Sequence, residues 1–222
     1  MNNIGKLQQI FKNKEFLRLA LTHKSWVNEH PGERQSNERL EFLGDAILEF
    51  IISSELFRQF PKKEEGYLTA LRANLVNTVN LAEVAKKMDV GASLYLSKGE
   101  EEGGGRQNQS LLADTVEAII GALYLDGGIE TAEHFIKENL IIEIPKKITK
   151  PLKDAKSRLQ EYVQSQGFMA PKYAIIEQSG PDHNKNFVVE VFVNGESWGK
   201  GVGKSKSLAE QEAAKAGLEK TL

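Results

Sequence analysis

The sequence contains no cysteine among its 222 residues. This absence excludes a disulfide framework, a thiolate zinc site, an iron–sulfur cluster and a cysteine nucleophile. Only four histidines are present, and none stands in an HExxH or a Ser-His-Asp arrangement, which argues against a zinc enzyme and a serine hydrolase. No apolar run approaches 18 residues and the first residues lack an apolar signal core, so we expect a cytoplasmic protein with no membrane partner.

The chain also lacks an excess of charge of one sign. Lysine and arginine number 29 against 31 aspartate and glutamate, which gives a net charge of −2 and an isoelectric point near 6.2. Bulk charge therefore does not indicate nucleic-acid binding, and any such function must depend on local clusters. The hydrophobic fraction of 40% and the charged fraction of 27% are ordinary globular values for a chain of one or two domains.

Apolar residues recur at helical spacing through the first 140 residues. The spacing predicts a helix beginning near Phe16 and further helices at 38–60, within 64–88 (two), at 111–125 and at 129–140. Residues 99–106, with the sequence GEEEGGGR, have no apolar periodicity, and we predict a flexible loop there.

The pattern changes after residues 145–153, which contain two prolines and four lysines and have no hydrophobic face. We interpret this segment as a linker between domains. Beyond it we expect a helix, three strands and a final helix, at 155–166, 172–178, 187–193, 197–202 and 207–222. Gly195 suits a hairpin turn, and residues 207–210, SLAE, have the spacing of a helix-capping box. The predicted domains are an all-helical domain at 1–144, the linker at 145–153 and an α-β-β-β-α domain at 154–222.

Two of the predicted helices carry acids among apolar residues. Glu38, Glu41 and Asp45 are spaced i, i+3, i+7 and therefore share one side of their helix. In the helix at 111–125, Asp114 and Glu117 are the only charged residues and lie one turn apart. A helix that is apolar nearly all round is normally buried, and burying an ionised carboxylate without a cation is costly.

Two acids on one face repel, so either a cation must reach them or one of them must stay protonated, and two kinds of cation are candidates. Carboxylate oxygens are hard ligands that suit Mg²⁺, Mn²⁺ or Ca²⁺. The alternative is that Asp114 and Glu117 form buried salt bridges with Arg39 or Arg72. The residues alone leave both open.

A lysine cluster lies near the C-terminus. Residues 199–206, GKGVGKSK, place three lysines just before and at the start of the final helix. Free backbone amides and the positive end of the helix dipole favour phosphate at such a position. An ordinary solvated turn is the alternative.

Three motifs resemble those of a known nuclease family. Residues 37–46, NERLEFLGDA, resemble the signature of ribonuclease III, and residues 20–25, ALTHKS, and 113–118, ADTVEA, resemble two further motifs of that family. The tail resembles a double-stranded-RNA-binding domain through three short stretches: 159–161 (LQE), 180–183 (GPDH) and 203–206 (GKSK). The likeness covers nearly the whole chain in the expected order, and the layout is similar to the bacterial form.

The resemblance implies an all-α ribonuclease III endonuclease domain followed by an α+β double-stranded-RNA-binding domain. It implies a homodimer, formed through the nuclease domain, that hydrolyses double-stranded RNA with Mg²⁺, which Mn²⁺ can replace. The products have a 5′ phosphate and a short 3′ overhang, and the expected substrates are precursors of ribosomal and messenger RNA. The implied site acids are Glu41, Asp45, Asp114 and Glu117 as metal ligands, Asp45 and Glu117 among them as catalytic residues, and Glu38 and Glu65 at the cleft and dimer interface.

The shape of A-form RNA indicates how the tail binds it. Recognition uses 2′-hydroxyls and phosphates across the wide minor groove. We expect the first tail helix to meet one minor groove, the loop after the first strand to meet the next, and the lysine cluster to contact the phosphates between them. The predicted residues are, in that order, Ser157, Gln160, Glu161 and Gln164; His183 and Lys185; and Lys204, Ser205 and Lys206.

Two other functions fit the residues. One is a duplex-RNA-binding or RNA-folding protein whose acids are structural, which Mg²⁺-dependent cleavage would eliminate. The other is a helical metal phosphohydrolase acting on nucleotides, with a tail used only for docking. Competition by duplex RNA but not by nucleotides would eliminate the second.

Overall fold

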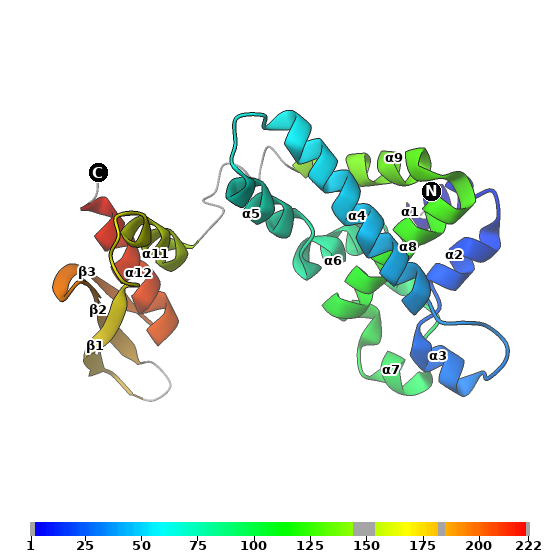
Figure 1. Ribbon diagram of the computed structural model, residues 1–222. Coiled ribbons are helices and arrows are strands. Elements are labelled where there is room, and N and C mark those ends of the chain that lie inside the picture. Colours follow the sequence, from blue (N-terminus) through cyan, green and yellow to red (C-terminus); the bar gives the residue numbers. More distant parts are fainter. Residues whose placement is uncertain (1–2, 144–153, 182–184, 221–222) are drawn as a thin grey trace. The chain divides into compact units, whose positions relative to one another are not determined.

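The computed structural model describes residues 3–143, 154–181 and 185–220 and divides the chain into two units, Met1–Leu152 and Lys153–Leu222. Figure 1 shows a helical first unit and a second unit with a small sheet. The linker predicted at 145–153 lies outside the described residues, so its bounds stay a prediction. Within the described part of the chain, no helix is long and apolar enough to span a membrane.

The first unit is helical, as the apolar spacing predicted. Its α-helices are α1 (Asn3–Ile10), α2 (Lys14–Ala20), α3 (Lys24–Glu29), α4 (Glu38–Gln59), α5 (Glu65–Leu75), α6 (Thr78–Lys87), α7 (Lys98–Glu102), α8 (Gln109–Gly127) and α9 (Ile129–Asn139). Single 3₁₀ turns are η1 (Val90–Ser93), η2 (Gly105–Gln107) and η3 (Ile141–Glu143). The core of the unit is built around α8, which packs against α2, α4, α6 and α9.

Helices α4 and α8 cross, and their backbones lie in contact at the crossing (Figure 1). A Cβ atom on Gly44 of α4 would lie 1.8 Å from the main-chain oxygen of Glu117, and one on Gly121 of α8 would lie 2.3 Å from that of Leu40. Only glycine permits this approach. The crossing therefore brings the acids of α4 against those of α8.

The segment predicted as a flexible loop at 99–106 is ordered, and that prediction was wrong. It forms the short helix α7 and the turn η2. Ser97 caps α7 by accepting a hydrogen bond from the Glu100 amide at 3.2 Å, and the Arg106 guanidinium donates to three main-chain carbonyls in and directly after η1. Apolar periodicity does not reveal this order because polar contacts provide it.

The second unit has the predicted α-β-β-β-α order. Its elements are α11 (Ala155–Ser165), β1 (Lys172–Ser179), β2 (Asn186–Val193), β3 (Glu196–Gly203) and α12 (Lys206–Glu219). The strands form an antiparallel sheet in the order β1-β2-β3. Alternate residues of β2 are buried against α11 and α12, as period-two patterning requires.

Two local turns set the ends of β3. Asn194 and Gly195 have φ values of 51° and 86°, as a tight two-residue hairpin needs, so the turn predicted at Gly195 is confirmed. The cap predicted at Ser207 was wrong, because Ser205 caps α12 and accepts a hydrogen bond from the Leu208 amide at 3.2 Å. Strand β3 ends at Gly203, and Ser205 is left in the extended backbone that an N-cap adopts.

Candidate active site

Three of the predicted acids meet at the crossing of α4 and α8. Glu41, Asp114 and Glu117 each offer a carboxylate oxygen, and these oxygens lie within 4.8 Å of one another. All three side chains are half-buried. Helical spacing places Asp114 and Glu117 on one face of α8. The glycine contact between α4 and α8 brings Glu41 close to both.

The electrostatics of this group favour a bound cation. Burial, followed by the charges of Asp45, Asp114 and Glu41, raises the pKa of Glu117 to about 7. Burial also raises the pKa values of Asp114 and Glu41 above their ordinary values. Carboxylates that repel one another in a half-buried site gain most from a divalent ion held by hard oxygen ligands. The residues present therefore fit a metal such as Mg²⁺.

The salt-bridge alternative is not found. Arg72 pairs with Glu49, with 2.7 Å between Nε and Oε2, and donates a hydrogen bond to Ser53 at 2.9 Å. Among the residues that the structure describes, Asp114 and Glu117 form no ion pair with lysine or arginine. Asp114 and Glu117 therefore have no ion-pair partner among the described lysines and arginines, although the charges of His23 and Lys24 act on Asp114 from a distance.

The remaining predicted acids lie outside the three-carboxylate group. Asp45 is exposed on α4, although its charge contributes most, after burial, to the raised pKa of Glu117. Glu38 accepts a hydrogen bond from Ser36 and pairs with Lys24 at 3.3 Å, and these contacts lower its pKa. Glu65, the first residue of α5, accepts a hydrogen bond from Thr69 at 2.8 Å and lines a groove between α4 and α5.

The structure adds Glu100 to the surroundings of the site. His23 lies close enough to Glu100, Glu38 and Asp114 for their charges to act on it, while burial lowers its pKa. Ser25, two residues after His23, accepts a hydrogen bond from the Ser97 amide at 3.0 Å and so anchors the start of α7. The S-x-x-E spacing of residues 97–100 was a capping signal that could have indicated this ordered position.

The residues predicted for RNA binding lie on three parts of the second unit. Gln160, Glu161 and Gln164 are exposed on α11, whereas the Ser157 hydroxyl donates a hydrogen bond to Asp154, the N-cap of that helix, at 3.1 Å. Lys185 precedes β2 and is half-buried. His183 lies outside the described residues.

Lys204, Ser205 and Lys206 are exposed at the N-terminus of α12. Residues 199–203 are not part of this turn, in agreement with the strand expected at 197–202. They form the end of β3, where a Cβ atom on Gly201 would lie 2.1 Å from the Ala213 amide nitrogen. The glycines of this strand therefore serve close packing of α12, and Lys200 lies 3.7 Å from Glu190 on the neighbouring strand.

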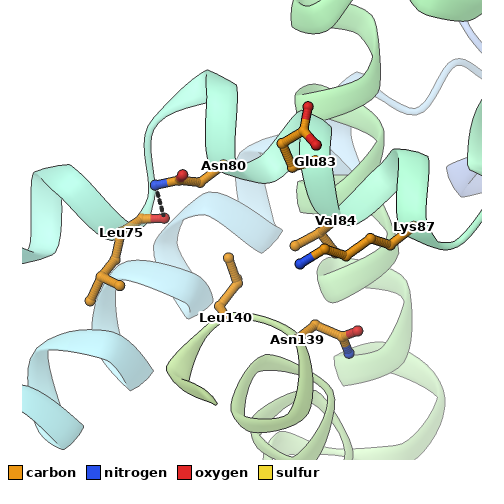
Figure 2. A pocket seen from close by; sticks show the side chains of 7 residues that line it. All are labelled: Leu75, Asn80, Glu83, Val84, Lys87, Asn139 and Leu140. Atoms are coloured by element: carbon orange, nitrogen blue, oxygen red, sulfur yellow. Dashed lines mark hydrogen bonds between the residues drawn. The ribbon is translucent and has the colours of Figure 1, made fainter. Parts of the chain in front are cut away.

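A separate pocket lies beside α6 and the end of α9 (Figure 2). Asn80 there donates a hydrogen bond to the Leu75 carbonyl at 3.2 Å. Glu83 is the single carboxylate among the residues that line this pocket, and it pairs with Lys86 at 2.8 Å. None of the predicted site acids lines the pocket, so it offers no second metal position.

The raised pKa of Glu117 predicts how metal affects stability. In metal-free protein the folded state binds a proton at Glu117 up to about pH 7, while an unfolded chain loses it near 4.5. The contribution of Glu117 to the free energy of unfolding is therefore greatest below pH 4.5, and it is lost as the pH rises through 7. Mg²⁺ should therefore raise Tm more at pH 8 than at pH 5. The difference between the two increases should be about 2–4 °C, which corresponds to roughly 1 kcal/mol in the free energy of unfolding after solvent screening.

Thermal unfolding followed by circular dichroism, in EDTA and in Mg²⁺ at both pH values, measures this difference. The variant Glu117→Gln provides the reference, because acids elsewhere titrate in both proteins. In EDTA at pH 8 it should be more stable than the wild type. Identical pH dependence in the two proteins would contradict the assignment.

Comparison with known proteins identifies both units. The first matches the family model described as Ribonuclease-III-like over residues 13–144, and the second matches the double-stranded RNA binding motif over residues 155–221. Ribonuclease 3 of Geobacillus kaustophilus is 46% identical over 216 residues, covering 97% of this chain and 88% of the relative. Ribonuclease 3 of Streptococcus gordonii is 45% identical, covering 95% of this chain and 91% of the relative.

A solved structure agrees with these matches. The nuclease domain of ribonuclease III from Campylobacter jejuni is 41% identical, with a TM-score of 0.56, and the match covers 68% of this chain and 99% of that domain. The metal dependence of the family agrees with the cluster of acids at the helix crossing. The chain belongs to the ribonuclease III family and is an endoribonuclease that acts on double-stranded RNA.

Proposed function

We propose that this protein is a Mg²⁺-dependent homodimeric enzyme that cuts both strands of duplex RNA, leaves 5′ phosphates with short 3′ overhangs, and processes precursors of ribosomal and messenger RNA. The observation that carries the proposal is the group of three carboxylates, from Glu41, Asp114 and Glu117, with no described lysine or arginine paired to Asp114 or Glu117. The cytoplasm is the proposed location.

In this proposal Glu41, Asp114 and Glu117 hold the ion, and Asp45 lies beside them. When bound, Mg²⁺ would supply a water of lowered pKa and neutralise charge on the phosphate; Mn²⁺ can replace it. The protein contributes a rigid helix crossing that keeps the carboxylates converged before RNA arrives. Asp45 and Glu117 are the proposed catalytic residues, and Glu38 and Glu65 flank the cleft.

For the second unit we propose that Ser157, Gln160, Glu161 and Gln164 meet a minor groove and that His183 and Lys185 meet the next. Lys204, Ser205 and Lys206 would contact the phosphates between them. The exposure of the α11 residues and the position of the lysines at a helix N-terminus support these roles. Because few lysines take part, binding should weaken only modestly with salt.

The surface of α4 supports the homodimer. Three large aromatic side chains on one side of this helix are open to solvent within the single chain: Phe42 is 80% exposed, Phe50 62% and Phe57 76%. Phenylalanine rarely stays exposed in such numbers unless another chain covers it. A second structure of the Campylobacter jejuni nuclease domain, 42% identical with a TM-score of 0.55, is described as flexible in a region involved in dimer formation.

Removing two of these aromatic rings should weaken the dimer. The double variant Phe42→Ala, Phe57→Ala removes two of the three exposed rings of α4, and its dimer Kd should rise by several hundred-fold, since buried interface aromatics commonly contribute about 2 kcal/mol each. Sedimentation equilibrium measures the change. Met169→Ala, which alters a residue that is 78% exposed in the other unit, should leave the dimer intact. An unchanged Kd in the double variant would place the interface elsewhere.

End-labelled RNA tests the activity itself. The purified protein is given a perfect duplex or the separate single strands, with Mg²⁺ or with EDTA, and the cut ends are mapped. Cutting of the duplex alone, lost in EDTA, is expected. Tight duplex binding without cutting under any divalent ion would mean that the acids are structural.

A further inference from the structure

Duplex RNA binding requires the two helices of the second unit to act together. In the proposed mode α11 meets a minor groove while the N-terminus of α12 contacts phosphates, and the distance between those features is set by the A-form helix. The relative position of the two helix N-termini therefore decides whether both contacts form on one duplex. This inference rests on the proposed function of these surfaces.

The position of α12 is set by the sheet. The glycines of β3 allow the helix to lie directly on the strand, where side chains on Gly201 or Gly203 would meet main-chain atoms of α12 at 2.1 Å and 2.5 Å. Helices α11 and α12 also pack closely, and a Cβ atom on Gly217 of α12 would lie 3.3 Å from Leu159 Cδ2 of α11. Small apolar side chains pack without direction and do not by themselves prevent one helix from sliding along the other.

A polar clamp joins the N-terminal end of α11 to the second turn of α12. The side-chain amide of Gln211, on α12, donates a hydrogen bond to Asp154 Oδ1 at 2.9 Å and accepts one from the Lys156 amide at 3.3 Å. Asp154 is the N-cap of α11 and also accepts from the Ser157 amide at 3.0 Å. One glutamine thus binds both the cap and a free amide of the first turn of α11.

Neighbouring contacts strengthen the clamp. Lys156 Nζ lies 2.5 Å from Glu210 Oε2, which precedes Gln211 on α12, and 4.8 Å from the centre of the Tyr173 ring on β1. The hydrogen bonds from Gln211 and Ser157 lower the pKa of Asp154, so its carboxylate stays ionised as an acceptor. Hydrogen bonds to a charged acceptor are stronger and more directional than neutral ones.

We propose that Gln211 is a positioning residue for duplex RNA, which holds the minor-groove helix α11 in register with the phosphate-binding end of α12. Gln211 touches no RNA in this scheme. Its loss should leave the domain folded but allow α11 to shift relative to the N-terminus of α12, so that the minor-groove and phosphate contacts no longer form together.

The test compares full-length variants in EDTA, where no cutting occurs, using a fluorescent RNA duplex of about 22 base pairs, longer than the roughly 16 that such a domain spans. Gln211→Met keeps the length of the side chain and removes both hydrogen bonds. Its Kd should rise about 3- to 10-fold, less than the full effect of two lost hydrogen bonds, because these bonds lie within the protein and affect RNA only through the position of α11. The matched control is Gln166→Met at the other end of α11, whose side chain makes only a long contact with Ser165.

A second readout separates positioning from simple destabilisation. The slope of log Kd against log salt reports the number of phosphate contacts, so it should stay unchanged in Gln211→Met and fall in Lys206→Met. Because the two lost hydrogen bonds also stabilise the domain, the Tm of Gln211→Met should fall by a few degrees, and binding is measured well below it. Gln211→Asn, which keeps an amide that is one methylene too short for both bonds, is the second variant and should give a similar loss of affinity.

The outcomes distinguish the two proposals. Wild-type affinity in both Gln211 variants overturns the clamp and leaves the proposed function standing. A weaker salt slope in Gln211→Met overturns it as well, because Gln211 would then be acting on the phosphate contacts. Failure of the wild type to bind duplex RNA would count against the proposed function.

Discussion

Replacing Glu117 with glutamine is expected to reduce the rate of duplex RNA cleavage by at least ~10²-fold while leaving the Kd for duplex RNA within about 2-fold of the wild type. The substitution keeps the size of the side chain and removes one negative charge from the half-buried group with Glu41 and Asp114. Losing a charged oxygen ligand weakens metal binding and removes stabilisation of the transition state. Single-turnover cleavage in Mg²⁺ and binding in EDTA measure the two effects separately.

A matched substitution provides the control. Glu83→Gln changes the same side chain on α6, where Glu83 pairs with Lys86 and takes no part in the site. It should cleave at the wild-type rate. Normal cleavage by Glu117→Gln in Mg²⁺ would show that Glu117 is not a ligand, and a parallel loss of duplex binding would point to a general defect in folding instead.

The variant Gly44→Ala is expected to lower both stability and activity. Its methyl group would lie 1.8 Å from the main-chain oxygen of Glu117, so α4 and α8 must separate. Overpacking of this kind costs about 1–3 kcal/mol, equal to a fall in Tm of roughly 3–10 °C. Cleavage should fall about 10²-fold in protein that is still folded, because a displacement near 1 Å disperses the carboxylates.

Gly5→Ala provides the comparison for this prediction. Gly5 lies in α1, and an added Cβ atom meets nothing within 4 Å, so alanine should stabilise that helix slightly. Thermal unfolding and cleavage at a temperature well below both Tm values measure the effects. A Gly44→Ala protein that unfolds and cleaves like Gly5→Ala would disprove the role of the close crossing.

Predictions from the sequence were most successful where structure is local. The helix expected at 38–60 is α4 (Glu38–Gln59), and the helix expected at 129–140 is α9 (Ile129–Asn139), since each follows from apolar residues three or four apart. The segment at 99–106 was missed because Arg106 orders it through carbonyls around η1 that lie some twelve to fifteen residues away. The spacing of apolar residues does not reveal polar contacts of this kind.

The composition of the active site shows the same division. The presence of acids on a buried helix, Asp114 and Glu117, was evident from the sequence, and so was the need for a cation or for a proton on one of them. The identity of that cation was not. Whether Arg72 was that cation depended on the position of its side chain, and the structure pairs Arg72 with Glu49 instead.

By itself the sequence determined the helices and strands, the helical faces that carry the acids, and through its motifs the family. These properties depend on neighbours a few residues apart, which the chain specifies directly. Only the tertiary structure decided that Glu41 joins Asp114 and Glu117 while Asp45 stays exposed, because that choice depends on the contact of Gly44 with a helix more than sixty residues later. The angle and depth of that crossing arise from the packing of the whole core around α8, and no local pattern in either helix encodes them.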